Sequence, residues 1–329
     1  MTKTTFFKFW LFLALGLTST VFSGCDKDDN KGSNENESNS LVKTISAKWE
    51  ISDSNSPYAS FEFNKDGNYI VVKNDVEPNL KSSSTDLNRS FLSKKGLKSM
   101  NLRSSETNLS PIHFGTYRIE GNNIILSGFG VIEIISITAE EFSFSFTLDA
   151  TGEKNSFVAN KSAEPISSSS RTDMLCRTWE VQKMTIDVDF ILNKFSSLTE
   201  EEIDYITERY GENWKQKFIE DELETAKKFT EFIENKTLTL TVLFSKAGTY
   251  LVLYDGPENI IVSGNRTWEF EDAGLSEWKW ANNEETKLYY SWNNWENNWE
   301  DNAVTINQLD DNTLVVQEEY ELTHLKIKK

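Results

Sequence analysis

The 329-residue sequence contains little of the side-chain chemistry on which most catalytic and metal sites depend. It has two cysteines and two histidines, and no phosphate-binding glycine loop or Asp-x-Asp-x-Asp-Gly calcium loop. His113 and His324 lie in opposite halves of the chain, so no Ser-His-Asp or Cys-His arrangement and no metal-ligand spacing can be assembled. Cys25 near the amino terminus leaves Cys176 alone, which excludes an intrachain disulfide framework. The sequence therefore predicts no metal and no cofactor.

Acidic side chains are abundant, but their pattern singles out no catalytic pair. Glu140/Glu141 and Asp310/Asp311 are adjacent in sequence, and both are most simply solvated turn residues. A glycoside hydrolase needs two carboxyl groups that are close in space, which no spacing here indicates. We therefore predict a protein that is not an enzyme.

Positive charge is also scarce. The chain has 34 Lys and Arg residues against 52 Asp and Glu residues, a formal net charge of −18. Removing residues 1–24 takes away two lysines and no acid, so the remaining chain carries −20. Nucleic acids need Lys and Arg to neutralise their phosphates, so a nucleic-acid partner is excluded. The same balance disfavours electrostatic docking onto an anionic membrane face.

No hydrophobic run is long enough for a membrane-spanning helix. The longest, Phe9 to Val21, would span about 20 Å as a helix, against a hydrocarbon core of about 30 Å. Lys3 and Lys8 precede it, and the small residues Ser23-Gly24 follow it. This order is typical of a secretory signal peptide over residues 1–24.

The residues after this signal resemble those of bacterial lipoproteins. Gly24-Cys25 resembles the lipobox, which implies cleavage before Cys25 and a lipid anchor on it; the alternative is an ordinary signal peptide with an incidental cysteine. Lys27-Asp28-Asp29 resembles the export signal of surface lipoproteins in Bacteroidota, which implies an outer-membrane protein facing the medium rather than the periplasm. Residues 26–40 contain no apolar side chain and predict a flexible tether with an r.m.s. span of about 20 Å.

From residue 41 onward the pattern predicts antiparallel strands. Phe142, Phe144, Phe146 and Leu148 alternate with Ser and Thr, which buries one face of a strand. Short turn segments such as 64–67 and 120–123 separate further strands. We expect a sandwich or barrel over residues 41–162, with a mobile loop at 75–110.

The pattern then repeats after a linker at residues 163–173. Three segments of the first half have counterparts, in the same order, in the second half: 45–51 with 175–181, 63–69 with 244–250, and 116–120 with 267–271. This indicates two copies of one β-domain, the second over residues 174–329. The second copy has an insertion at about 189–235 that predicts two helices, the first with a Thr199–Glu202 capping box and an end at Gly211, the second capped by Asn213. Its apolar stripe favours packing against its own barrel over binding a partner.

These repeated segments resemble the lipocalin-like domains of Bacteroidota lipoproteins. The likeness rests on the strands around Trp49 and Trp179, on the Phe-x-x-x-Gly-x-Tyr hairpins, and on Gly115-Thr116-Tyr117. It implies a mainly β chain with two tandem lipocalin-like antiparallel β-barrels, in which Trp49 and Trp179 close the barrel floors. A small barrel is filled by its own side chains or holds one small ligand, and both alternatives stay open here.

Two features predict binding. Trp278 and Trp280 share a strand face, and Trp292, Trp295 and Trp299 follow among asparagines, a composition that suits sugar stacking or a protein interface. The alternative is that these rings cover one end of the second barrel. Glu318 shares a strand face with apolar neighbours and predicts a buried acid, unless the register shifts at the strand end.

We therefore expect a non-catalytic, lipid-anchored binding module for a small apolar ligand or a glycan. The alternative is a structural or assembly component of the cell envelope that docks a protein partner.

Overall fold

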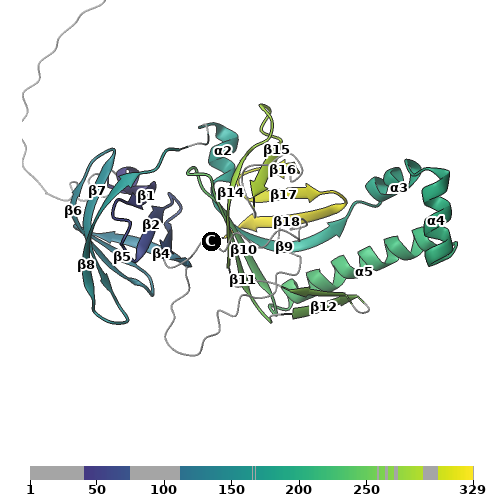
Figure 1. Ribbon diagram of the computed structural model, residues 1–329, viewed down its shortest axis with the longest axis horizontal. Helices are drawn as coiled ribbons and strands as arrows, with labels where there is room; N and C mark the ends of the chain where they lie inside the picture. Colours follow the sequence, from purple (N-terminus) through teal and green to yellow (C-terminus); the bar gives the residue numbers. More distant parts are fainter. Residues whose placement is uncertain are drawn as a thin grey trace, which may run out of the picture.

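The computed structural model describes residues 41–74, 112–164, 166, 168–257, 259–263, 266–269, 273–291 and 303–328. The predicted signal peptide, Cys25, Lys27, Asp28, Asp29, the tether and the loop at 75–110 lie outside the described residues. Within the described chain, two closed eight-stranded antiparallel barrels follow one another (Figure 1). This confirms the expected mainly β fold and is consistent with two lipocalin-like barrels.

Barrel 1 is built from consecutive strands, and its last strand pairs with its first. Alternation in β7 directs Phe142, Phe144 and Phe146 into the barrel, where all three are buried. The strands are β1 (Lys48–Ile51), β2 (Tyr58–Phe63), β3 (Asn68–Lys73), β4 (Ile112–Glu120), β5 (Asn123–Leu126), β6 (Gly130–Ile137), β7 (Glu141–Leu148) and β8 (Lys154–Lys161).

Barrel 2 repeats this order with additions. A separate hairpin, β12 (Asn259–Ser263) and β13 (Arg266–Glu269), lies between its third and fourth strands, and its last strand closes on its first. The barrel strands are β9 (Thr178–Ile186), β10 (Thr239–Phe244), β11 (Thr249–Asp255), β14 (Ala273–Trp280), β15 (Lys287–Ser291), β16 (Ala303–Leu309), β17 (Thr313–Glu318) and β18 (Glu321–Ile327).

One end of each barrel is covered by a short helix and a tryptophan. Residues 41–45 are helical before β1, and α2 (Ser170–Leu175) precedes β9. The indole N–H of Trp49 donates to the carbonyl of Ile45, and that of Trp179 to Leu175, both at 2.9 Å. Both rings are fully buried, so they are structural parts of what we call the capped ends. The opposite ends are called the far ends.

Backbone pairing corrects one of the three sequence matches between the copies. The N–H of Tyr117 donates to the carbonyl of Gly67, and the N–H of Trp278 donates to that of Gly248, both at 2.8 Å. Tyr117 in β4 therefore corresponds to Trp278 in β14. The match of residues 116–120 with 267–271 was wrong, because a threonine followed by an aromatic residue fits any strand and the β12–β13 hairpin has no counterpart among the described residues of barrel 1.

The insertion contains three helices rather than the two predicted: α3 (Val188–Ser196), α4 (Glu200–Tyr210) and α5 (Trp214–Glu234). The Thr199–Glu202 capping box and the end of α4 at Gly211 are present as predicted. The Asn213 side chain, in contrast, makes no capping hydrogen bond to α5. The unpredicted α3 is capped by Asp187, whose Oδ1 accepts from the N–H of Phe190 at 2.9 Å.

The second half of α5 packs against β9 and the β12–β13 hairpin. Ala226, Phe229 and Ile233 are buried there, and the Thr230 hydroxyl accepts from the N–H of Met184 at 3.1 Å. This supports the expected packing of the stripe onto its own barrel. The first half of α5 leaves the barrel with α3 and α4, and these elements form an arm on the side of barrel 2 away from barrel 1 (Figure 1). None of the described helices is long and apolar enough to cross a membrane.

Candidate functional site

The interior of barrel 1 is filled by aromatic side chains. Tyr58 makes edge contacts with four surrounding rings at centroid distances of 5.3–6.2 Å, and Phe142 lies 4.5 Å from Phe144. Phe61, Phe144 and Phe146 are each 2% exposed or less. Of the two alternatives left open by the sequence, the described part of barrel 1 therefore corresponds to the filled barrel.

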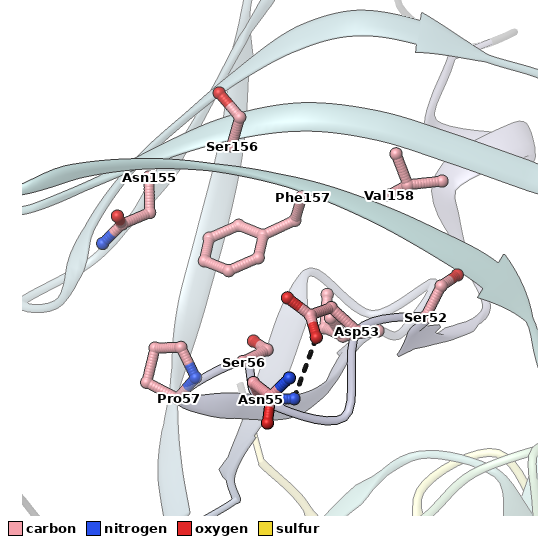
Figure 2. Close-up of a pocket in the computed structure, with 10 residues that line it drawn as sticks. Ser52, Asp53, Asn55, Ser56, Pro57, Asn155, Ser156, Phe157 and Val158 are labelled. Carbon is pink, nitrogen blue, oxygen red and sulfur yellow. Dashed lines mark hydrogen bonds between the residues drawn. The ribbon is translucent and has the colours of Figure 1, made fainter.

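A surface pocket of about 370 Å³ lies at the far end of barrel 1, between the 51–57 segment and residues 155–158 of β8 (Figure 2). Its polar groups are used within the loop, since the N–H of Asn55 donates to Asp53 Oδ1 at 2.9 Å and that of Tyr58 to the Ser56 hydroxyl at 3.0 Å. Phe157 is directed into the space between the two segments (Figure 2). Asp53 and Ser56 are thus engaged by the loop itself, whereas a specific site needs polar groups that converge on a ligand.

The first two candidate tryptophans close the capped end of barrel 2. Trp278 is only 1% exposed, and its indole N–H donates to the carbonyl of Ser245 at 2.9 Å. Trp280 donates to the Thr172 hydroxyl of α2 at 2.9 Å, and the two rings meet edge to face at 5.4 Å. At Trp278 and Trp280 the structure therefore agrees with the alternative left open by the sequence, in which these rings cover one end of the second barrel, because strand alternation directs both residues into the barrel.

Trp292, Trp295 and Trp299 lie outside the described residues. The strands that flank them are described: β15 ends at Ser291 and β16 begins at Ala303. Both positions are at the far end of barrel 2, since Thr305 pairs with Gln317 close to the end of β17.

Glu318 lies at this same far end, where it is half-buried rather than fully buried as the sequence predicted, and the structure supplies its partner. The Tyr290 hydroxyl on β15 donates to Glu318 Oε1. Tyr290 and Tyr250 are fully buried, with ring centroids 5.8 Å apart. Burial raises the pKa of both phenols well above 10, and the Glu318 carboxylate raises each pKa further. Both hydroxyls therefore remain protonated and able to donate at neutral pH.

Two more polar side chains belong to this interior. Ser276 on β14 pairs with Tyr250 on β11, and its buried hydroxyl has no hydrogen-bond partner among the described residues. Thr323 on β18 pairs with Met184 and is 4% exposed. We call Tyr250, Ser276, Tyr290, Glu318 and Thr323 the far-end cluster.

Comparing the strand registers of the two barrels shows what is particular to this cluster. A bulge interrupts the pairing at the equivalent place in each barrel, between β16 and β17 in barrel 2 and between β6 and β7 in barrel 1. Aligning the two bulges matches Leu314 with Phe142 and therefore Glu318 with Phe146. On the next strand, Thr323 pairs with Val316, and in barrel 1 Phe157 pairs with Phe144. Thr323 therefore occupies the position of Phe157. The Tyr250–Ser276 pair corresponds to Tyr69–Gly115, and Tyr290 corresponds to Leu126. Tyr250 has the same side chain as its counterpart Tyr69, so the far half of barrel 2 is more polar than that of barrel 1 at the other four positions of the cluster.

The far-end cluster has the chemistry of a binding site. A carboxylate accepts hydrogen bonds, and tyrosine, serine and threonine hydroxyls both donate and accept them. It contains one acid and no histidine, cysteine or lysine. Among the residues that the structure describes, no group of three or more His, Cys, Asp or Glu side chains could hold a metal ion.

The sequence indicated Glu318 but not Tyr290, Ser276 or Thr323. Tyr290 comes from another strand, and only the barrel closure brings it to Glu318. Correct alignment of the two copies would have given a signal, because Glu318 and Thr323 then replace two phenylalanines. Comparison with family models and with curated proteins finds no match for this chain.

The second candidate is the arm. Helix α4 has no buried residue, and Tyr205 and Tyr210 are 61% and 58% exposed. Residues 187–234 contain 14 acidic and six basic side chains, a net charge of −8. The arm therefore presents exposed tyrosines on a negatively charged surface.

Proposed function

We propose that this protein is a lipid-anchored, surface-exposed, non-catalytic binding module, and that a glycan binds at the far end of barrel 2. The anchor is the lipid on Cys25, and Lys27-Asp28-Asp29 direct the chain to the outer face of the outer membrane. Barrel 1 is the filled barrel nearest the tether. Barrel 2 carries the site.

One observation carries this proposal: the far-end cluster replaces barrel-filling phenylalanines with Glu318 and Thr323. Buried polar groups are costly and are often less stabilising than apolar side chains of similar volume. A barrel that served only as a scaffold would gain from keeping the phenylalanines of barrel 1. Hydroxyls and a carboxylate suit the many hydroxyl groups of a sugar, so the cluster favours a glycan over a small apolar ligand.

A glycan array tests the proposal with the chain from Cys25 onward, carrying Cys25→Ser to prevent lipidation. We expect the wild-type chain to bind a defined set of glycans and Glu318→Gln to bind them about 10- to 100-fold more weakly, the range for one hydrogen bond to a charged group. The matched control is Glu153→Gln, an exposed acid at the far end of barrel 1, which should bind as wild type.

Two results would contradict the glycan assignment. One is an array on which the wild-type chain binds nothing, and the other is undiminished binding by Glu318→Gln. Trp295→Ala is tested as a separate variant, because the two strands that flank Trp295 in the sequence end beside the far-end cluster. We expect that variant to lose binding as well, through loss of a stacking ring.

The arm supports a second function, docking of an envelope protein with a basic surface. Exposed tyrosines are common anchors of protein interfaces, and the negative charge of the arm favours a positively charged partner. Photo-crosslinking in intact cells from position 205 should give one defined adduct that position 156 of barrel 1 does not give. Equal adducts from both positions would remove this candidate.

A further inference from the structure

The two barrels meet through the outer faces of their sheets. Ile70 of β3 packs with Leu243 of β10 and Leu251 of β11, and each is at most 1% exposed. Five partly buried apolar side chains surround them: Val72, Ile112, Phe114, Leu253 and Leu275. This apolar junction is small compared with the core of either barrel, so polar contacts at its edge contribute to the arrangement of the barrels.

One edge of the junction has complementary polar contacts. Asp66 Oδ2, in the β2–β3 turn, accepts from the Thr178 hydroxyl at 2.7 Å and from the Thr178 N–H at 3.1 Å. Asn68 Nδ2 donates to the same hydroxyl at 2.8 Å. These bonds tie the β2–β3 turn of barrel 1 to the first residue of β9.

Glu62 is an acidic side chain that is buried in this junction with only part of its hydrogen-bonding capacity used. It lies on the outward face of β2, yet barrel 2 covers it and leaves it only 3% exposed. Its Oε2 accepts from the Thr249 hydroxyl at 2.7 Å, and the Ser245 hydroxyl also hydrogen bonds to the carboxyl group. Its Oε1 is buried without a hydrogen-bond partner among the described residues. An ionised carboxylate with one oxygen left without a partner is costly to bury.

Few charges offset this cost. Lys48 pairs with Glu62 across the β1–β2 ladder, and its attraction lowers the pKa of Glu62. Lys48 is shared with Glu50 on β1 and with Glu277 on β14 of barrel 2. The Cys176 thiol before β9 lies within the influence of Glu62 and is neutral, because burial raises its pKa far above the usual value. Three further charged groups act on the same thiol: Lys65 of the β2–β3 turn, and Lys246 and Asp173, which form an ion pair with each other.

We propose that the junction is a pH-dependent clamp, in which protonated Glu62 holds the barrels together and ionised Glu62 drives them apart. The inference does not depend on the glycan site, since it concerns only how the barrel near the tether holds the other barrel. Separation would hydrate the carboxylate and free barrel 2 to turn on barrel 1.

The direction of the pH effect follows from burial. Burial raises the pKa of Glu62 above its ordinary 4.5, against smaller opposing effects of Ser245, Thr249 and Lys48. Docking therefore favours the protonated acid. The stabilisation is complete below pH 4.5 and is lost as the pH rises through the raised pKa.

Energy transfer between two dyes tests the clamp. One dye is attached at Ala150→Cys in barrel 1 and the other at Glu208→Cys on α4, both exposed positions, in the chain from Cys25 with Cys25→Ser. Cys176 stays unlabelled at neutral pH because its thiol is not ionised. Between pH 4 and 9 we expect the transfer efficiency of the wild-type chain to change with a single-proton midpoint. Glu62→Gln should hold the acid-form efficiency throughout.

Two further variants identify the titrating group. Thr249→Val removes a hydrogen bond that lowers the pKa of Glu62, so its midpoint should shift to higher pH. Glu140→Gln, an exposed acid in the β6–β7 turn of barrel 1 and outside the junction, is the matched control and should titrate as wild type. The proposal is overturned by a pH-independent wild-type chain, by a Glu62→Gln chain that still titrates, or by an unshifted Thr249→Val midpoint. If Glu62→Gln fails to fold, the Thr249→Val midpoint decides the matter.

Discussion

At the scale of single residues, several aromatic side chains that fill the barrels also hydrogen bond to the backbone through their polar tips. Trp278 donates to the carbonyl of Ser245, and its counterpart Tyr117 donates to the carbonyl of Asn64 at 3.1 Å. The same anchor therefore holds the first hairpin turn of each barrel, with an indole in one copy and a phenol in the other. This conserved geometry between the copies marks Trp278 as structural.

Replacing these anchors should affect stability and not binding. We expect Trp278→Phe to lower the free energy of unfolding by about 1–2 kcal/mol through one lost hydrogen bond, and Trp278→Ala to lower it by about 3–5 kcal/mol. Urea denaturation followed by circular dichroism measures both, with Tyr117→Phe as the matched change in barrel 1. A Trp278→Ala chain of undiminished stability would show that this ring is not part of the core.

His113 gives a pH dependence at the same scale. Its ring stacks on Phe129 at 4.1 Å inside barrel 1, and its Nε2 is buried without a hydrogen-bond partner within the described chain. Burial, and secondarily the positive charge of Lys73, lowers the pKa of His113 to about 4. The folded state thus favours the neutral ring.

The stability that comes from neutral His113 is present above pH 6.5 and is lost as the pH falls towards 4. We expect the urea midpoint of the wild-type chain to fall over this window relative to that of His113→Phe, which cannot take up a proton there. Parallel curves for the two chains would mean that the histidine is not held neutral by the fold.

At the scale of elements, the arm and the barrels differ in what holds them together. The barrels bury continuous cores, whereas α4 has no buried residue and begins with a capping box. Helix α4 should therefore open locally without unfolding the barrel to which it is attached.

Thr199→Ala isolates this behaviour. Loss of the N-cap costs a helix about 1 kcal/mol, so hydrogen exchange over residues 200–210 should become faster. The urea midpoint of the barrels should remain unchanged, because Thr199 is exposed and its capping hydrogen bonds are made to Glu202 of the same helix. A lowered midpoint would show that the arm supports the barrel and is not an independent element.

The element scale also shows how far sequence reasoning reached. Period-2 alternation predicted β7 and the inward direction of its phenylalanines, because a strand with one buried face must alternate. The capping box predicted the start of α4 from two side chains. Helix α3 was missed because its cap, Asp187, follows directly on a strand and the helix is only nine residues long. The arrangement of β12–β13 was missed because a short aromatic match cannot distinguish an inserted hairpin from a barrel strand.

At the scale of the whole molecule, two copies of one barrel have diverged in their interiors. The sequence indicated the duplication and the inward acid at Glu318. It could not show that Glu318 takes the place of Phe146, nor that Tyr290 meets it, because both depend on strand register and barrel closure. Contacts between distant segments, including the Glu62 junction, were not predictable for the same reason.

This divergence predicts a trade between stability and binding. Glu318→Leu, which restores an apolar residue at the position of Phe146, should raise the urea midpoint of barrel 2 or leave it unchanged while abolishing glycan binding. Tyr290→Phe should instead lower the midpoint, because the half-buried carboxylate of Glu318 then loses a donor. A Glu318→Leu chain that both binds and unfolds as wild type would indicate that the acid has neither role.

The most direct test is to map where a glycan identified on the array protects the chain. Hydrogen exchange is measured with and without the glycan, at the pH of the array. Binding at the far end of barrel 2 predicts slower exchange at the end of β9, at the end of β15 and across the β17–β18 turn, with no change in barrel 1. Protection confined to the 51–57 loop of barrel 1, or to the arm, would contradict the proposed site.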